Sequence, residues 1–259
     1  MPRKDLKNKP LVEAMLELRW VLPDQQSPGM ASDPHYRLLL GRFSERVQKD
    51  YPAHEPLPTS TIPDSMVPHT VQHRFRATPN GWPLLQMGPG IVTVNDTAGY
   101  TWTDFQKRCE TAVRWLVDAH PSPSALKFQD VTLRYIDAVA FDYKAANLFD
   151  FLRDKMKTTF ALPDSLFVGA EVASSPASFH WQASFEKKEP DGTVTIRFAT
   201  GAREGQASLI WETLVQSTGA QVPSMPAEFP KWLESAHDIT DDWFFKLIEG
   251  DLERRFSGE

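Results

Sequence analysis

Residues 12–20 read Val12-Glu13-Ala14-Met15-Leu16-Glu17-Leu18-Arg19-Trp20. Every second residue from Val12 to Trp20 is apolar, and the residues between them are Glu13, Met15, Glu17 and Arg19. Because successive side chains of a strand point to opposite faces, this stretch predicts a half-buried β-strand. Its Leu18-Arg19-Trp20 has a counterpart in Leu133-Arg134-Tyr135, inside a second alternating stretch. A hairpin signal follows each strand, Asn80-Gly81 and Asp191-Gly192. The chain therefore reads as two similar halves.

Each half predicts a strand, a helix, three strands and a final helix. The helices are expected from Asp33-Pro34 to Val47, from Thr103 or Asp104 to Ala119, from an Asn147 cap to Met156, and from about Thr240 to Phe256. Clean alternation predicts strands with one buried face. The expected fold is α+β, a mainly antiparallel curved sheet of about eight strands with helices on one face. Its two β-α-β-β-β-α halves are expected to give a saddle-like, pseudo-two-fold arrangement.

The expected organisation is a disordered N-terminus over residues 1–10, a first half over 11–123 and a second half over 124–259, with both halves in one compact domain. Residues 51–70 hold five prolines and predict a long surface loop. On the second-half strands, Arg134, Gln182 and Arg197 are expected to point away from the helices. The residues expected to be buried are Val131, Leu133, Phe179, Trp181, Phe185, Ile196 and Phe198.

Composition limits the function classes. The chain has 259 residues, a net charge of −6 and 41% hydrophobic residues, values that favour a soluble globular protein without generic attraction to nucleic acid. No apolar run approaches the roughly 20 residues that span a bilayer, so no membrane association is expected. The single cysteine and the lack of a signal peptide favour the cytoplasm.

Several segments, in this order and spacing, resemble an uncharacterised family of sporadically distributed bacterial proteins of similar length. The resemblance covers nearly the whole chain, and it implies no activity, because the family brings no established catalytic residues. The segments that carry it are Pro10-Leu11-Val12-Glu13-Ala14, the stretch from Gly88-Pro89-Gly90 to Tyr100-Thr101-Trp102-Thr103-Asp104-Phe105, Leu133-Arg134-Tyr135-Ile136, and Ala236-His237-Asp238 with Phe245, Leu247-Ile248, Leu252 and Phe256.

His237 and Asp238 are the candidate catalytic residues. An imidazole beside a carboxylate can act as a general base or bind a metal. The alternative is structural: Asp238 or Thr240 would cap the last helix, with Asp241 and Asp242 complementing its dipole.

The candidate ligand-binding residues lie on the polar faces of the expected strands. Guanidinium groups suit carboxylates and phosphates, so this face is a candidate binding surface. The alternative is a solvated face of cross-strand Arg–Glu pairs involving Glu13, Glu17 and Glu186. The candidates are Arg19, Arg74, Arg76, Arg134, His180, Gln182 and Arg197.

Other motifs favour structural roles. Gly88-Pro89-Gly90 lacks the Lys-Ser/Thr of a phosphate loop and predicts a tight strand connection. Cys109 lies on an apolar helix face and predicts a buried thiol. Asn95-Asp96 and Tyr100-Thr101-Trp102 are options for a pocket, but a turn and a hydrophobic anchor before a helix are favoured. No cofactor or metal motif is present, so none is expected.

The leading hypothesis is a non-enzymatic bacterial protein that binds a protein or a small anionic ligand across the polar face of its sheet, with a homodimer as a further option. The first alternative is an enzyme, a hydrolase or nuclease that uses His237 and Asp238. The second is a nucleic-acid-binding saddle, which the negative charge disfavours.

Overall fold

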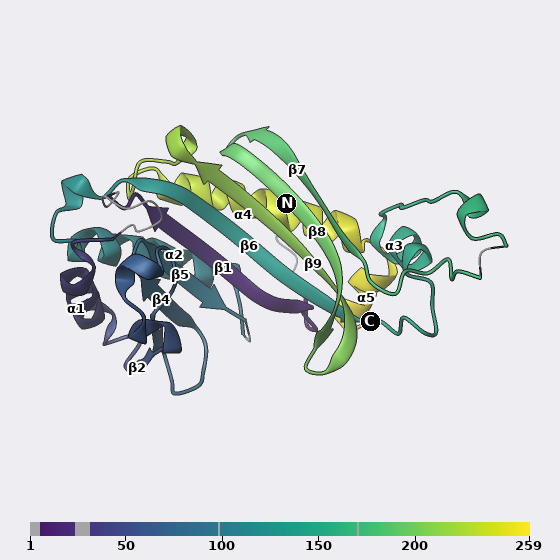
Figure 1. Ribbon diagram of the computed structural model, residues 1–259, viewed down its shortest axis with the longest axis horizontal. Coiled ribbons are helices and arrows are strands. Elements are labelled where there is room, and N and C mark those ends of the chain that lie inside the picture. Colours follow the sequence, from purple (N-terminus) through teal and green to yellow (C-terminus); the bar gives the residue numbers. More distant parts are fainter. Residues whose placement is uncertain (1–5, 24–31, 98, 170) are drawn as a thin grey trace.

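The computed structural model describes residues 6–23, 32–97, 99–169 and 171–259. Within these residues, nine strands form one open sheet in which all neighbours are antiparallel, in the order β2-β3-β4-β5-β1-β6-β9-β8-β7 (Figure 1). The α+β class and the antiparallel sheet are confirmed. The strands are β1 (Leu11–Trp20), β2 (Ala53–Pro56), β3 (His73–Arg76), β4 (Leu84–Gly88), β5 (Ile91–Asp96), β6 (Phe128–Ala140), β7 (His180–Lys188), β8 (Asp191–Arg203) and β9 (Gln206–Thr218).

The centre of the sheet is the pair β1–β6, which joins the two predicted halves. Leu16 lies opposite Leu133, and Leu18 lies opposite Val131. Outward from this pair, the order is β5-β4-β3-β2 on one side and β9-β8-β7 on the other. One sheet thus spans both halves, while the internal repeat and the pseudo-two-fold axis stay predictions.

The part of the chain that is described contains five α-helices, and the long ones cover one face of the sheet. Ala14, Leu16, Leu18 and Trp20 of β1 are buried in the main core. Helix α2 packs against β5, and α4 packs against β6 and β9, where Figure 1 shows it behind the strands. The opposite face remains toward the viewer. The helices are α1 (Tyr36–Val47), α2 (Trp102–Ala119), α3 (Leu148–Met156), α4 (Phe229–Ile248) and α5 (Asp251–Ser257).

Part of the segment 51–70, expected to be a loop, forms a strand. The described sheet therefore has nine strands instead of about eight. Ala53–Pro56 forms β2, a short edge strand that pairs with β3 from Ala53↔Arg76 to Pro56↔His73. Proline is tolerated there because an edge strand needs no ladder donor on its outer side. Two short 3-10 turns, Pro58–Thr61 and Asp64–Met66, follow.

The last long helix begins at Phe229 rather than near Thr240, so the expected cap by Asp238 or Thr240 is wrong. Pro230 lies in the first helical turn, where its missing N–H costs nothing. The Thr240 hydroxyl instead donates to the carbonyl groups of Ala236 and His237 within the helix, at 3.2 and 2.9 Å. Gly250, at a φ of 103°, separates α4 from α5.

Other helix starts differ by a few residues from the sequence pattern. Helix α1 begins at Tyr36, and Asp33 accepts a hydrogen bond from the backbone N–H of His35. Thr101, not Thr103 or Asp104, caps α2 and accepts from the Asp104 N–H at 3.3 Å. Asn147 caps α3, as expected.

Burial on the second-half strands follows the prediction except at the edge. Val131, Leu133, Ile196 and Phe198 are buried, whereas Phe179 and Trp181 on the edge side are only partly buried. Phe185 is 49% exposed, so its expected burial is wrong. It lies on β7, which has a neighbouring strand on one side only.

At the N-terminus, disorder was expected over residues 1–10. Residues 1–5 lie outside the described part. The expected disorder is not seen over residues 6–10, since Leu6 is buried and the Asn8 N–H donates to the Phe256 carbonyl at 2.8 Å. Among the described residues, no helix is both long and apolar enough to cross a bilayer.

Candidate functional site

The register of the sheet places the predicted arginines on one face. Directly opposite residues of neighbouring strands point to the same side, as do residues two apart on one strand. The row through Arg74 is polar across the whole sheet. It runs Glu55, Arg74, Gln86, Thr93, Glu17, Thr132, Gln216, Thr193 and Glu186. Arg19, Arg76, Arg134 and Arg197 lie at even spacings from members of this row and share its face, which we call the polar face.

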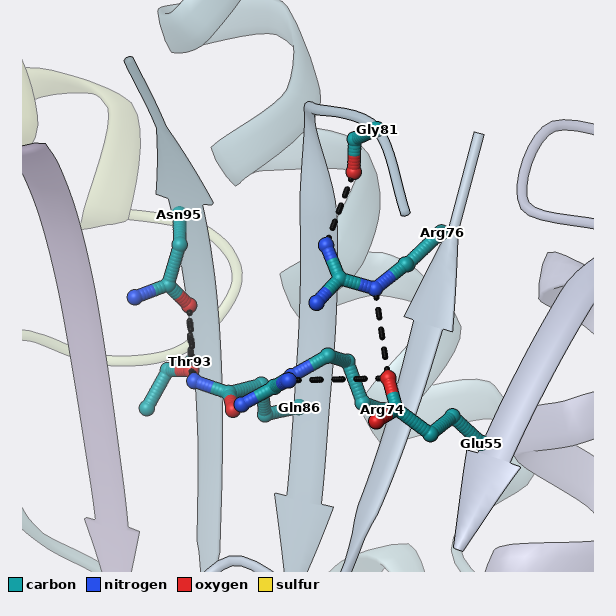
Figure 2. Close-up of polar contacts among 7 residues, drawn as sticks. All are labelled: Glu55, Arg74, Arg76, Gly81, Gln86, Thr93 and Asn95. Atoms are coloured by element: carbon teal, nitrogen blue, oxygen red, sulfur yellow. Dashed lines mark hydrogen bonds and ion pairs between the residues drawn. The ribbon is translucent and has the colours of Figure 1, made fainter. Parts of the chain in front are cut away.

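Arg74 and Arg76 form an outer group on this face, together with Glu55 of β2. Figure 2 shows the Glu55 carboxylate between the two guanidinium groups, with nitrogen–oxygen distances of 3.5 Å to Arg74 and 3.2 Å to Arg76. Arg74 also donates to the Gln86 side chain, and Arg76 to the Gly81 carbonyl, at 3.1 and 2.9 Å. These two arginines therefore tie β2, β3 and the Asn80-Gly81 turn together.

Arg19, Arg134 and Arg197 belong to a separate group that surrounds a hollow of about 280 Å³ on the polar face. Their side chains keep 40, 29 and 32% exposure. The described side chains that line the hollow include these three guanidinium groups and one carboxylate, Glu17. The hollow thus has an excess of positive charge, although the protein as a whole is negative.

Each arginine at the hollow has an acidic neighbour. Arg19 pairs with Glu17 at 2.8 Å. Arg197 donates to Glu212 at 3.2 Å and to Gln182 at 2.6 Å, and Arg134 lies 3.9 Å from the same Glu212 carboxylate. Cross-strand Arg–Glu pairs therefore form, but with Glu212 rather than with the expected partners: Glu17 pairs with Arg19 on the same strand, and Glu13 accepts from Asn95. Sharing one carboxylate between two arginines leaves part of their donor capacity for a further anion.

The remaining predicted residues are not brought together. His180 is exposed at the start of β7, on the side of Gln182 but outside the residues that line the hollow. His237 is buried on the other face of the sheet. Asp238 is exposed and does not line the cavity that His237 lines. A His237–Asp238 site is thus divided between two sides of α4.

His237 lines a cavity of about 260 Å³ on the helix side of the sheet. Its walls come from the start of β1, from β6 and β9, and from α2 and α4. Aromatic side chains dominate these walls: Tyr100, Trp102, Tyr135, Phe244 and Phe245. The Tyr100-Thr101-Trp102 segment, which the sequence favoured as an anchor, therefore contributes to a pocket as well as starting α2.

A hydrogen-bonded chain lies along this cavity. The hydroxyl groups of Tyr100 and Tyr135 are 2.9 Å apart, and the Tyr135 hydroxyl is 3.0 Å from His237 Nδ1. The Trp102 ring stacks on the His237 ring with centroids 3.6 Å apart. Burial raises the pKa of both tyrosine hydroxyls, so both stay protonated at neutral pH.

Asp137 is a further residue that the sequence did not single out. It is 3% exposed and lines the cavity from β6. Burial raises the pKa of its carboxyl from 3.8 to about 8. The positive charge of Arg203 acts in the other direction and lowers this pKa, but by less. The signal was in the alternation, because Val131, Leu133 and Tyr135 point inward and Asp137 continues the same series.

Of the other motifs, the glycine-proline connection and Cys109 have the structural places that their patterns favoured, whereas the turn favoured for Asn95-Asp96 is wrong, because both residues lie in β5. Pro89-Gly90 forms the tight turn between β4 and β5, and Gly90 has a φ of 77°. Cys109 is buried in the core, and burial raises the pKa of its thiol. In the described ranges, no group of three or more His, Cys, Asp or Glu side chains is placed to hold a metal ion.

Comparison with known proteins gives no further assignment. No family model and no curated protein matches the sequence. Membership of the family that the sequence resembles stays a prediction, and the site has to be interpreted from its own chemistry.

Proposed function

We propose that this is a cytoplasmic, non-enzymatic binding protein whose polar face takes an anionic group in the hollow between Arg19, Arg134 and Arg197. The group is a carboxylate or phosphate, on a small ligand or on the surface of a protein partner. The observation that carries this proposal is the convergence of three partly exposed guanidinium groups, from three strands, on one hollow of about 280 Å³.

The chemistry of the hollow supports an anion rather than an apolar ligand. Threonine, serine and glutamine side chains surround the arginines: Thr132, Ser184, Thr193, Thr195, Gln182 and Gln216. Guanidinium groups bind planar oxyanions through two parallel hydrogen bonds, and neighbouring hydroxyl and amide groups complete the coordination. Rigid strands hold these groups, so little ordering is needed on binding.

The test compares two charge-removing variants of the same face. Arg134→Gln with Arg197→Gln alters the hollow, whereas Arg74→Gln removes an arginine that is also paired with glutamate but lies outside it. Each immobilised protein is exposed to extract of the source organism, and bound proteins and small molecules are identified by mass spectrometry. Inorganic phosphate and succinate are titrated in parallel by NMR.

We expect the double variant to lose at least tenfold in affinity for its anion, because a hydrogen bond to a charged group contributes about 1.5–3 kcal/mol. Arg74→Gln is expected to stay within twofold of wild type. Binding should also weaken with added salt. If the double variant captures the same species as wild type, and its phosphate and succinate titrations are unchanged, the proposal is wrong.

The two alternatives have less support. A nuclease or hydrolase that relies on His237 with Asp238 lacks a shared site for the two side chains. Nucleic-acid binding is opposed by the net charge of −6. A gel-shift titration at low salt distinguishes the latter, since an absence of any shift would eliminate it.

A further inference from the structure

The cavity on the helix side of the sheet is a second site, independent of the polar face. Asp137 of β6 lines it, with Tyr135 two residues earlier on the same face. Among the described residues, no hydrogen bond or ion pair reaches the Asp137 carboxyl, although its side chain is almost fully buried. A buried polar group without a partner costs free energy, so such a carboxyl inside a cavity points to a ligand.

The positive groups near Asp137 are engaged elsewhere. Arg203, at the end of β8, donates to the backbone carbonyl groups of Pro10 and Leu11 at 3.1 and 3.3 Å. The Lys9 ammonium, at the start of the β1 segment, donates to the Tyr100 carbonyl at 2.8 Å. Neither group donates a hydrogen bond to the Asp137 carboxyl, although the charge of Arg203 acts on it, so a cation in direct contact with this carboxyl would come from a ligand.

The walls of the cavity suit the same kind of ligand. Rings of Tyr100, Trp102, Tyr135, Phe244 and Phe245 surround the space. The faces of aromatic rings attract cations, most strongly where water is excluded, and aromatic cages recognise quaternary ammonium groups. A second carboxylate, Asp241, lines the cavity from α4 one turn beyond His237.

We infer that this cavity binds a small organic cation, an alkylated ammonium whose carbon groups pack on the aromatic walls and whose charge pairs with Asp137. A cation gains a direct charge pair once Asp137 gives up its proton, whereas a neutral or anionic ligand gains no such pair and leaves Asp137 protonated. The site is distinct from the arginine-lined hollow, which lies on the opposite face of the sheet.

Binding of a cation is coupled to proton release. Burial raises the pKa of Asp137 to about 8, so at pH 7 the free protein holds this proton and the complex gives it up. The charged or titratable groups that line the cavity with Asp137 are Lys9, His237, Asp241, Tyr100 and Tyr135, and the charge of Arg203 also acts on Asp137. Affinity for a ligand of fixed charge should therefore rise about tenfold per pH unit up to pH 8 and then become constant.

The experiment uses three molecules of nearly the same shape. Choline carries a permanent positive charge, 3,3-dimethylbutan-1-ol is its neutral carbon isostere, and 3,3-dimethylbutanoate is a related anion. Each is titrated into the full chain by calorimetry between pH 6 and pH 9. We expect choline to bind at least tenfold more tightly than either of the others at pH 8.5, with the pH dependence given above.

Two variants locate the effect. Asp137→Asn keeps the shape of the side chain and removes its charge, so choline affinity should fall at least tenfold and lose its pH dependence. Asp238→Asn makes the same change on the exposed side of α4 and should bind choline as wild type does. Thermal melts establish that both variants are folded.

The inference is overturned if the alcohol or the carboxylate binds as tightly as choline. It is equally overturned if choline at 50 mM gives no heat at pH 8.5, or if its affinity in wild type is independent of pH. None of these three results needs a variant, so the inference can fail even if Asp137→Asn does not fold.

Discussion

Replacement of Asp137 by asparagine should change how the stability of the protein depends on pH. The carboxyl is buried, and its pKa is raised from 3.8 to about 8 in the folded state. Between these two values the unfolded chain has lost the proton and the folded chain has kept it. The free energy of unfolding therefore falls as pH rises through this window, and above about pH 8 the loss is complete.

The magnitude follows from the size of the shift. Each pH unit inside the window removes about 1.4 kcal/mol, so wild type loses about 4 kcal/mol from this group between pH 4 and pH 7. The amide that replaces the carboxyl is neutral at every pH and has nearly the same shape, so the variant lacks this loss. We therefore expect Asp137→Asn to be more stable than wild type at pH 7 by a few kcal/mol, and the difference to vanish near pH 4.

The assay is urea unfolding of both proteins at half-unit steps from pH 4 to pH 9, monitored by tryptophan fluorescence. The difference between the two curves isolates Asp137, because the other titrating groups are common to both. Asp238→Asn serves as the control for removing one carboxylate from an exposed position. A difference between Asp137→Asn and wild type that stays constant with pH, or grows toward pH 4, would refute the assignment of a raised pKa.

Three further predictions concern the fold. Gly41→Ala, at an exposed position in the middle of α1, should stabilise the protein by about 0.5–1 kcal/mol. Gly88→Ala should destabilise it by about 3 kcal/mol, because the added Cβ would lie 1.8 Å from the Thr70 carbonyl oxygen. Urea unfolding should therefore show changes of opposite sign for the two variants. Asn147→Ala removes the cap of α3, whose side chain accepts from two backbone N–H groups, and should lower the free energy of unfolding by about 1 kcal/mol; an unchanged midpoint would contradict the cap. Cys109 should react with a thiol reagent only after unfolding in urea, since its thiol is buried and its raised pKa disfavours the thiolate; stoichiometric reaction of the native protein would be inconsistent with this.

The sheet could be predicted because its information is local. Alternation along residues 12–20 and the Asn80-Gly81 signal depend only on neighbouring residues, and both the β1 strand and the β3–β4 hairpin form. β2 could not be predicted, because its four residues carry no alternation and become a strand only by pairing with β3. The expected start of α4 near Thr240 is also too late, because Pro230 lies in the first helical turn, where a proline does not prevent a helix from starting.

The candidate site depended on information of another kind. The shared face of the arginines followed from period-two spacing, but their separation into two groups depends on strand order. That order places β3 and β4 at one end of the sheet and β6, β9 and β8 beyond β1. His237 and Asp238 are adjacent in sequence, yet neighbours on a helix point about 100° apart, so sequence proximity overstated their association. Tyr135 and His237 meet only because α4 packs across β6.

The two sites use alternate residues of one strand, and this makes their tests independent. Arg134 points to the hollow on the polar face, while Tyr135 and Asp137 point to the cavity under α4. Changing Arg134 removes charge on one side of β6 and leaves the aromatic walls on the other side intact. Changing Asp137 does the reverse. Loss of anion binding in the arginine variant should therefore leave choline affinity unchanged, and loss of choline binding in Asp137→Asn should leave the capture of anionic species unchanged. If either variant abolished both activities, the shared cause would be the integrity of β6, and neither binding assignment could rest on that variant.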